Sequence, residues 1–271
     1  MPEGSPFGPG IQAAVAYLHG CHMVGFKRLT ELCEGLFGLT ISQGAISNML
    51  ARMGQPFGAA ADEIAATVRA SEVIASDETS ARVKGKTRWQ WTFGCATAIY
   101  HVIAPTRGKC VPTEFLAGAR PKVWLSDRLP AQCTHAEAHQ FCLAHLIRDA
   151  QYAIDHGDAI FAPQFKAFLK DACAVGRRRP DLADSTIAAH RRRLERELDR
   201  LLSACRRMDL KPTDVEGSHR RAAIAVTARD KLLVFLTRRD VEATNNESER
   251  ALRLSVIFRS CLLYTSPSPR D

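Results

Sequence analysis

Two short apolar runs each end in the pair Ser-Asp, one at 73–77 and the other at 123–127. Both runs are partly β-branched, which is typical of buried strands. A helix is expected between them at 111–116, and a strand, a helix and a strand in this order pair their strands in parallel. The sequence therefore predicts an α/β fold in which Asp77 and Asp127 lie at the ends of adjacent strands.

Two further strands are expected between these runs, so that the sheet is mixed. Residues 89–93 alternate between apolar and polar, the pattern of a half-buried strand. Residues 99–103 are expected to pair with them antiparallel, and a turn at 84–86 joins 89–93 to the strand before it. Side chains alternate along a strand, so Glu78 points to the opposite face from Asp77. We expect Glu78 either to have a structural role or to support the residues of the site.

A third carboxylate, Glu249, lies near the start of a predicted helix. Thr244 and Glu247 have the spacing of a capping box, which gives Glu247 a local structural role but leaves Glu249 without one. Asn245 and Asn246 precede Glu249 by four and three residues and so share its face of the helix. Their amides could position a phosphate or a metal-bound water.

Two aspartates at strand ends and one glutamate on a helix can converge on a pair of divalent cations roughly 4 Å apart. Such ions activate a water or a 3′-hydroxyl group and stabilise the leaving oxygen of a phosphodiester. Carboxylate oxygens suit Mg²⁺, a hard cation that keeps several waters. Asp77, Asp127 and Glu249 are therefore candidate catalytic and metal-binding residues. Arg250 and Arg253 follow on the same helix, where they would contact DNA phosphate or favour its later turns.

Four motifs occur in one order along the chain: SDET at 76–79, SD at 126–127, CLAHLIRD at 142–149 and TNNESERALR at 244–253. In this order they resemble the insertion-sequence-66 family of DDE transposases, and the resemblance runs from residue 7 to about residue 259. It implies an RNase H-like core, a mixed sheet with flanking helices, that carries an all-α insertion and follows an N-terminal helical segment. The catalytic triad it implies is Asp77, Asp127 and Glu249.

The resemblance also implies a cofactor and partners. The cofactor is Mg²⁺, with Mn²⁺ expected to substitute, and the substrate is DNA at transposon ends and at the target. A homodimer that pairs two ends is expected, in the bacterial cytoplasm at the nucleoid. Cys142 and His145 match a Cys-x-x-His feature of the family. After Asp127 the chain departs from the family, because residues 128–130 (RLP) stand where many members have Gly-Tyr. The departure affects the substrate contacts expected near Asp127 but not its expected metal-binding role.

The chain divides into five expected segments. Residues 1–70 are helical, 71–132 form the first part of the catalytic core, 133–240 form a basic helical insertion, and 241–260 carry the glutamate helix that completes the core. Residues 261–271 lack apolar periodicity. We interpret them as a non-native tail, either translated sequencing adapter or, alternatively, a natural disordered terminus.

The N-terminal segment has the pattern of a helix-turn-helix, in which a short glycine-containing turn joins two helices. Ser42 is a plausible N-cap for the second helix, over 43–53. Gln43, Ser47 and Asn48 lie near the start of that helix, where base edges are usually read. A plain helical bundle packed on the catalytic core is the alternative.

Charge and cysteine usage limit the class of protein. The net charge is +8, and residues 166–239 contain 19 Lys and Arg against 10 Asp and Glu, so this region suits phosphate contact or is a solvated helical face. No run of 18 apolar residues occurs, so no membrane span is expected. The nine cysteines include no CxxC pair, which indicates reduced thiols in a cytosol.

Five possible ligands for a soft metal lie in one short stretch: Cys133, His135, His139, Cys142 and His145. A zinc site is one interpretation, although the spacing is not that of a standard zinc finger. The alternative, which we favour, is that Cys142 is a buried small hydrophobic residue and His145 a hydrogen-bonded helix residue beside the active site.

Three functions are compatible with these patterns. The first is a DNA transposase that cleaves insertion-sequence ends and transfers their strands through a DDE triad, although this polypeptide could be inactive alone. The second is an RNase H-like nuclease or resolvase that shares the metal chemistry but not strand transfer. The third is a truncated, non-catalytic copy that binds the ends and represses.

Overall fold

The computed structural model describes residues 6–83, 85–207 and 229–265. The chain divides into two units, one made of Met1–Ile64 with Leu252–Asp271 and the other of Ala65–Ala251. The second unit holds the five-stranded sheet and the three candidate catalytic carboxylates. Among the helices of the described residues, none combines the length and the apolar character that a membrane crossing requires.

The first unit is helical, as predicted. It contains α1 (Pro9–Gly20), α2 (Phe26–Phe37), α3 (Gln43–Arg52) and most of α4 (Gly54–Arg69). Helices α1–α3 enclose a small core that includes Val15, Leu29 and Met49. The Ser42 Oγ accepts a hydrogen bond from the Ala45 N–H at 3.1 Å, so the predicted N-cap of α3 is confirmed.

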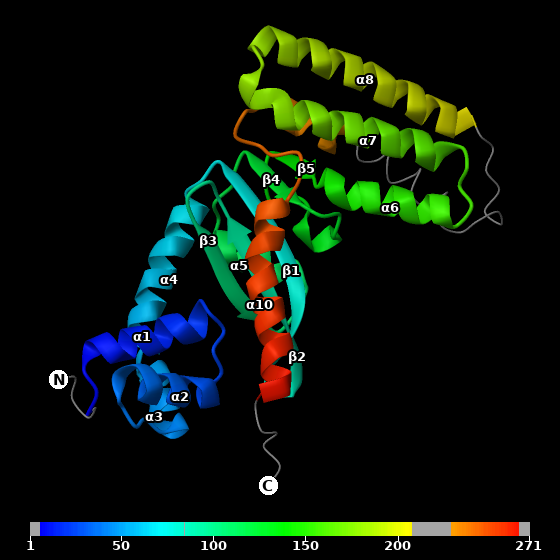
Figure 1. Ribbon diagram of the computed structural model, residues 1–271. Coiled ribbons are helices and arrows are strands. Elements are labelled where there is room, and N and C mark those ends of the chain that lie inside the picture. Colours follow the sequence, from blue (N-terminus) through cyan, green and yellow to red (C-terminus); the bar gives the residue numbers. More distant parts are fainter. Residues whose placement is uncertain (1–5, 84, 208–228, 266–271) are drawn as a thin grey trace. The chain divides into compact units, whose positions relative to one another are not determined.

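The sheet of the second unit is mixed, as predicted (Figure 1). Its strands are β1 (Val73–Val83), β2 (Lys86–Gly94), β3 (Ile99–Ala104), β4 (Val123–Ser126) and β5 (Ala138–Phe141), in the order β3-β2-β1-β4-β5. β1 pairs antiparallel with β2, and β2 pairs antiparallel with β3. β4 pairs parallel with β1 on one side and with β5 on the other. Both predicted pairings, 89–93 with 99–103 and the first run with the second, are confirmed.

The first strand is longer than predicted. β1 continues beyond Asp77 to Val83, because its polar second half pairs with the first half of β2. Asp77 therefore lies inside a strand rather than at its end. Gly85, whose φ is 75°, occupies the left-handed region that glycine tolerates and turns the chain into β2. Lys84, which belongs to the predicted turn, lies outside the described residues.

The fifth strand corrects the prediction that residues 133–240 are all helical. The sequence of β5, AHQF, has no apolar run to reveal it. Its polar residues are buried because they find partners: Gln140 Nε2 donates to Leu232 O at 3.1 Å, and Gln140 Oε1 accepts from Phe235 N at 3.0 Å. The first helix of this region is α6 (Leu143–Asp155).

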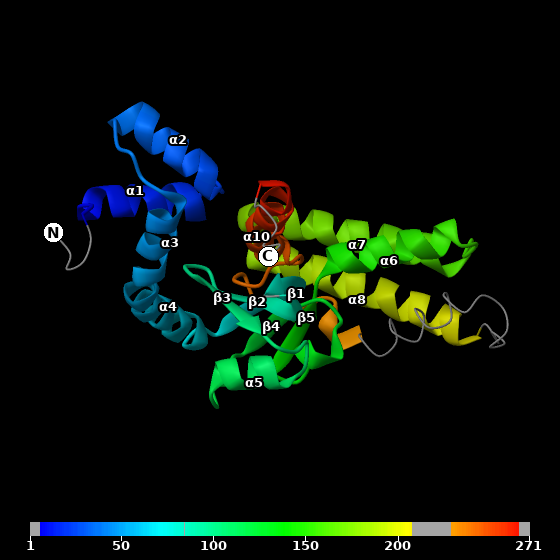
Figure 2. The ribbon, with the colours of Figure 1, turned by 90° about the horizontal axis from the view of Figure 1, so that it is seen from below.

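Helix α5 (Cys110–Leu116) covers one face of the sheet (Figure 2). Trp91 and Phe93 of β2 and Trp124 of β4 are fully buried against it. The rings of Phe93 and Phe115 stack with their centroids 4.0 Å apart. Each buried aromatic side chain of this kind contributes about 2–3 kcal/mol to stability. β1 and β4 therefore share a closely packed, largely aromatic core on this face.

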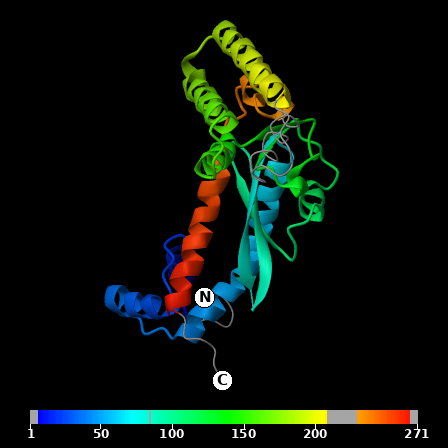
Figure 3. The same ribbon diagram turned by 90° about the vertical axis from the view of Figure 1, so that its right-hand side faces the viewer.

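Residues of the other face pack against helices, of which α7 and α8 (yellow-green and yellow in Figure 3) lie beyond one end of the strands. The layer consists of α6, α7 (Phe161–Arg178), α8 (Asp184–Arg207) and the short 3₁₀ helix η4 (Val234–Leu236). The remaining 3₁₀ helices are η1 (Pro130–Gln132), η2 (Arg179–Asp181) and η3 (Arg229–Lys231). Arg179 is buried and donates to the carbonyl oxygens of Phe235, Arg238 and Val241. Residues 208–228 of the predicted insertion lie outside the described residues.

The last helix, α10 (Asn246–Thr265), begins later than predicted. Asn245 occupies its N-cap position, because the Glu249 N–H donates to the Asn245 carbonyl oxygen at 3.1 Å. The predicted capping box with Thr244 as the N-cap is therefore wrong. At its other end α10 continues to Thr265, so residues 261–265 of the predicted tail are helical; residues 266–271 lie outside the described residues.

Candidate active site

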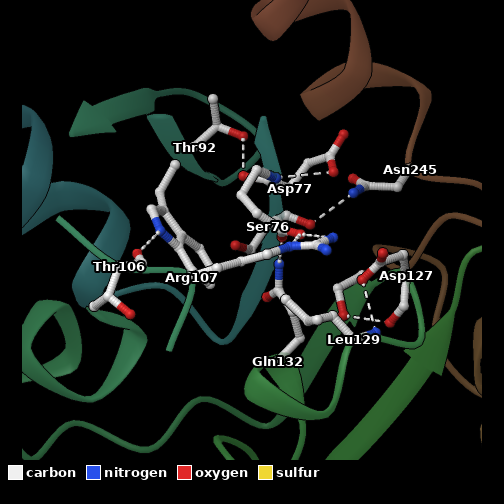
Figure 4. Close-up of polar contacts among 12 residues, drawn as sticks. Ser76, Asp77, Thr92, Thr106, Arg107, Asp127, Leu129, Gln132 and Asn245 are labelled. Atoms are coloured by element: carbon white, nitrogen blue, oxygen red, sulfur yellow. Dashed lines mark hydrogen bonds and ion pairs between the residues drawn. The ribbon is translucent and has the colours of Figure 1, made fainter. Parts of the chain in front are cut away.

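Asp77 and Asp127 are brought together by the register of β1 and β4. Each aspartate lies two positions beyond the last pair of the parallel ladder. The Asp77 Oδ1 accepts a hydrogen bond from the Glu78 N–H at 2.9 Å. The Asp127 Oδ1 accepts one from the Leu129 N–H, also at 2.9 Å (Figure 4). The second oxygen of each carboxylate has no hydrogen-bond partner among the described residues, so backbone donors orient both groups and leave an oxygen available.

The charges of this site act on Asp77. Burial raises its pKa most, and the negative charges of Glu78, Asp127 and Glu249 raise it further. The hydrogen bond from the Glu78 N–H acts in the opposite direction, and the resulting pKa is about 7. The repulsion shows that the carboxylates of Asp77, Asp127 and Glu249 lie within electrostatic range of one another. A site of this kind favours either a proton or a cation.

Glu249 is held by helix α6. Its Oε1 accepts a hydrogen bond from the Arg148 Nη2 at 2.8 Å and lies 3.4 Å from the His145 Nδ1. The side chain of Glu249 is about one-quarter exposed, and that of Arg148 is 60% exposed. The predicted triad therefore has two members positioned by the sheet and a third positioned by contacts between two helices.

Asn245 joins the start of α10 to the sheet. Its Nδ2 donates to the Ser76 carbonyl oxygen at 2.8 Å (Figure 4). Its backbone N–H donates to the Cys142 Sγ at 3.2 Å. Asn245 is 1% exposed and Ser76 is fully buried, yet the Asn245 Oδ1 and the Ser76 Oγ have no hydrogen-bond partner. The buried Oγ of Ser76 and the buried Oδ1 of Asn245 therefore both lack a hydrogen-bond donor.

Glu78 has the structural role expected for it. It lies on the opposite face of β1 from Asp77, and its side chain is 1% exposed. The Glu78 Oε1 accepts from the Arg107 Nη2 at 2.6 Å, and its Oε2 accepts from the Gln132 Nε2 at 2.7 Å (Figure 4). The Arg107 guanidinium also lies 4.9 Å from the centre of the Trp89 ring. Glu78 thereby connects β1 to the two loops that follow β3 and β4.

The five possible zinc ligands do not come together. Cys133, His135 and His139 contact Leu129 O, Ala131 O and Ser126 Oγ, respectively. Among the described residues, Cys142, His145 and Glu249 form the group of three whose ligand atoms (sulfur, nitrogen or oxygen) all lie within 4.8 Å of one another. Cys142 is buried, as expected, and burial raises the pKa of its thiol. His145 differs from the expectation, because its Nδ1 has no hydrogen bond.

The residues predicted to contact DNA differ in exposure. Gln43, Ser47 and Asn48 are exposed on α3, and Asn246, Arg250 and Arg253 are exposed on α10. Asn245 is the exception, because its side chain is buried and its amide nitrogen is used by Ser76.

Two residues of the site are absent from the sequence predictions. Arg148 contacts Glu249, and Gln132 contacts Glu78. Arg148 follows His145 by three residues, so the helical spacing within the CLAHLIRD motif is the signal that places both on one face of α6. Gln132 has no such signal, because η1 is a single irregular turn.

Comparison with known proteins identifies the family. None of the curated proteins matches the chain. The family described as "Transposase IS66 family" matches residues 4–268, which is nearly the full length and includes the three candidate catalytic carboxylates. The chain therefore belongs to the IS66 family of transposases.

Proposed function

We propose that the protein catalyses metal-dependent strand cleavage and strand transfer at insertion-sequence ends. The observation that carries the proposal is the pairing of Asp77 and Asp127 on neighbouring strands, each with one oxygen oriented by the backbone and the other available. Glu249 lies close enough for its charge to raise the pKa of Asp77. Membership of a transposase family gives this arrangement its substrate class, which is DNA.

The donors of the site fit a hard divalent cation. Asp77, Asp127 and Glu249 offer carboxylate oxygens, the ligands that Mg²⁺ and Mn²⁺ prefer. The unpartnered Oδ1 of Asn245, on the α10 side of the sheet, is suited to accept a hydrogen bond from bound water. When bound, the metal would activate the attacking oxygen and stabilise the leaving oxygen of the phosphodiester. The protein's own part is to hold the carboxylates: the Glu78 N–H orients Asp77, and the Leu129 N–H orients Asp127.

The topology supports an RNase H-like core with a helical insertion. Three antiparallel strands are followed by two parallel ones, and helices cover both faces of the sheet. Helices α6–α8 separate β5 from Glu249 in the sequence, as the proposed insertion requires. A dimer that pairs two DNA ends, at the nucleoid in the bacterial cytoplasm, completes the proposal.

The basic insertion supports DNA binding through a specific group of arginines. Many of its arginines have carboxylate partners: Arg191, Arg193 and Arg229 form ion pairs with Glu195, Asp171 and Asp199. Arg192, Arg196 and Arg200, which we call the arginine stripe, are exposed and have no carboxylate partner among the described residues. They recur every four residues of α8, so they lie along one face at steps of about 6 Å. Such a row suits contact with DNA phosphates.

Replacement of the arginine stripe tests this part of the proposal. Arg192→Gln, Arg196→Gln and Arg200→Gln together should weaken DNA binding about tenfold or more, whatever the DNA sequence. The magnitude of the slope of log K against log salt concentration should fall by about 2 to 3, because a protein that makes fewer phosphate contacts releases fewer counterions when it binds. The matched control, Arg191→Gln, Arg193→Gln and Arg229→Gln, makes the same change in charge at paired positions. An equal effect in both triple variants would show that overall charge, and not the stripe, binds DNA.

Cleavage of DNA that carries cognate ends tests the catalytic proposal. Wild-type protein with Mg²⁺ or Mn²⁺ should nick the ends and join them to target DNA, and Asp77→Asn or Glu249→Gln should abolish both. Glu247→Gln is the matched control, because Glu247 lies on the same turn of α10 but is exposed and outside the triad. Activity that persists in Asp77→Asn would refute the triad. Cleavage without joining, on DNA that lacks the ends, would favour an RNase H-like nuclease or resolvase.

One observation favours a second candidate function. Among the described residues, Glu249 contacts Arg148 and His145 and not the aspartates. A non-catalytic copy that binds the ends and represses would keep this arrangement. Tight binding of the ends together with no cleavage in Mg²⁺ or Mn²⁺ would establish that function instead.

A further inference from the structure

A thiol, an imidazole and a carboxylate meet beside the proposed magnesium site. Cys142 is the N-cap of α6, and His145 lies in the first turn of the same helix. Glu249 comes from the first turn of α10. The Sγ, the ring nitrogen and the carboxylate oxygen of this group, which we call the Cys-His-Glu cluster, all lie within 4.8 Å of one another. The start of one helix and the start of another thus supply three kinds of metal ligand.

The chemistry of the cluster differs from that of the aspartate pair. Thiolate and imidazole are ligands for zinc, whereas Mg²⁺ takes oxygen ligands. A set of sulfur, nitrogen and oxygen donors therefore selects Zn²⁺ over Mg²⁺. The aspartates, which offer oxygen alone, have the reverse preference. One carboxylate, that of Glu249, belongs to both groups.

The geometry of the cluster is close to that of a zinc site. Two ligands at 2.0–2.1 Å from zinc and at the tetrahedral angle lie about 3.4 Å apart. The His145 Nδ1 and the Glu249 Oε1 are 3.4 Å apart. This pair has no hydrogen-bond geometry, since the Nδ1 is buried and has no hydrogen-bond partner. A metal ion would satisfy a nitrogen that otherwise bears the cost of burial without a partner.

The remaining contacts of the cluster are compatible with a metal. The Cys142 Sγ accepts the Asn245 N–H at 3.2 Å, and such a hydrogen bond also supports a metal-bound thiolate. Arg148 donates to the same Glu249 oxygen at 2.8 Å, and its charge opposes a cation there. Its side chain is 60% exposed, so it can turn into solvent.

We propose that Cys142, His145 and Glu249 bind one zinc ion, with water as the fourth ligand. Zinc bound there takes Glu249 away from the magnesium site, so it inhibits the transposase until zinc is removed. The binding of zinc stands on the cluster alone, whereas the inhibition rests on the proposed function.

Cobalt spectroscopy tests the binding. The full chain, once freed of metal, should bind one equivalent of Co²⁺ and show thiolate-to-cobalt charge-transfer absorption in the near ultraviolet. Zn²⁺ should displace the bound Co²⁺. Cys142→Ser should abolish this absorption, and His145→Gln should weaken binding by at least about 10- to 100-fold. Cys133→Ser is the matched control, because Cys133 comes from the same stretch of sequence but contacts Leu129 O. Absorption that survives in Cys142→Ser, or none in the wild type, would overturn the proposal.

A measurement on the wild type covers the case in which a variant does not fold. X-ray absorption at the zinc edge should show one sulfur at about 2.3 Å with nitrogen and oxygen at about 2.0–2.2 Å. A shell of oxygen and nitrogen alone would contradict the cluster.

Inhibition of DNA cleavage by Zn²⁺ tests the second part of the proposal, that bound zinc inhibits the protein. In Mg²⁺, Zn²⁺ should inhibit the wild type at concentrations at least about 10-fold lower than those that inhibit Cys142→Ser. Equal inhibition of both proteins would refute the regulation but leave the binding intact. If cobalt binds and no cleavage occurs under any condition, the proposed function fails and the zinc site stands.

Discussion

The two halves of the candidate active site are built in different ways. Asp77 and Asp127 are placed by the register of parallel strands over an aromatic core and are oriented by backbone N–H groups. Glu249 is placed by side chains of another helix, one of which is 60% exposed. The sheet therefore positions one half of the site before any ligand binds, whereas the position of the other half depends on side-chain contacts that a ligand can replace.

The largest expected effect is on metal binding, in which substitutions in the two halves of the site should differ. Asp77→Asn should abolish Mn²⁺ binding in calorimetry and reduce cleavage by at least about 10³-fold, because it removes a rigid ligand. Glu249→Gln should reduce cleavage as strongly but retain one bound Mn²⁺, held by the aspartates. Glu247→Gln should bind like the wild type. Loss of all Mn²⁺ binding in Glu249→Gln would show that the aspartates do not form a site by themselves.

Acid should remove the contribution of one buried histidine, beside Asp127, to the stability of the fold. His139 contacts the Ser126 Oγ at 3.0 Å, next to Asp127, and burial together with Lys231 and His135 lowers its pKa to about 3. Because the folded pKa lies below the unfolded value of about 6.5, this neutral histidine stabilises the fold above pH 6.5, and the stability is lost as the pH falls toward 3. The loss between pH 7 and pH 5 should be about 2 kcal/mol.

Urea unfolding at the two pH values measures this effect. His139→Gln cannot titrate, so its free energy of unfolding should change by about 2 kcal/mol less than that of the wild type over the same interval. An equal pH dependence in the two proteins would show that His139 already carries its proton in the fold.

Replacement of Asn245, the N-cap residue of α10 in the glutamate half of the site, should destabilise the protein. Asn245→Ala removes the amide that donates to Ser76 O, and the free energy of unfolding should fall by about 1–2 kcal/mol. Asn246→Ala, at the exposed neighbouring position, should change it by less than about 0.5 kcal/mol. Equal effects in chemical denaturation would indicate that helix propensity, and not the contact with β1, explains the loss.

The smallest expected effect concerns the exchangeable contact. Arg148 competes with a metal for Glu249, so Arg148→Gln should raise the affinity for Mn²⁺ by up to about fivefold, the range expected for an exposed ion pair. Arg250→Gln, an exposed arginine on α10, should leave the affinity unchanged. If the affinity falls in Arg148→Gln, Arg148 instead positions Glu249 for the metal.

The same contrast explains which features the sequence predicts. The strand order around β1 and β4 follows from apolar runs and the short helix between them, so the neighbouring aspartates are predictable. The continuation of β1 and the presence of β5 are not, because their polar residues enter the sheet through specific partners, such as those of Gln140. A four-residue strand without an apolar run carries no periodic signal.

The start of α10 shows a second limit of prediction. Thr244 and Glu247 have the spacing of a capping box, but Asn245 becomes the N-cap because its side chain and its N–H are both used by other elements. Contacts of this kind join residues that are about 100 or more positions apart, and local spacing does not contain them. The role of Arg148 beside Glu249 belongs to the same class.

Crystals grown with Mn²⁺ and examined by anomalous scattering show whether the three carboxylates bind a pair of metal ions. We expect two manganese peaks roughly 4 Å apart, bound by oxygens of Asp77, Asp127 and Glu249, with Arg148 released from Glu249. Manganese bound away from the aspartates, or absent while Glu249 keeps its contact with Arg148, would contradict it.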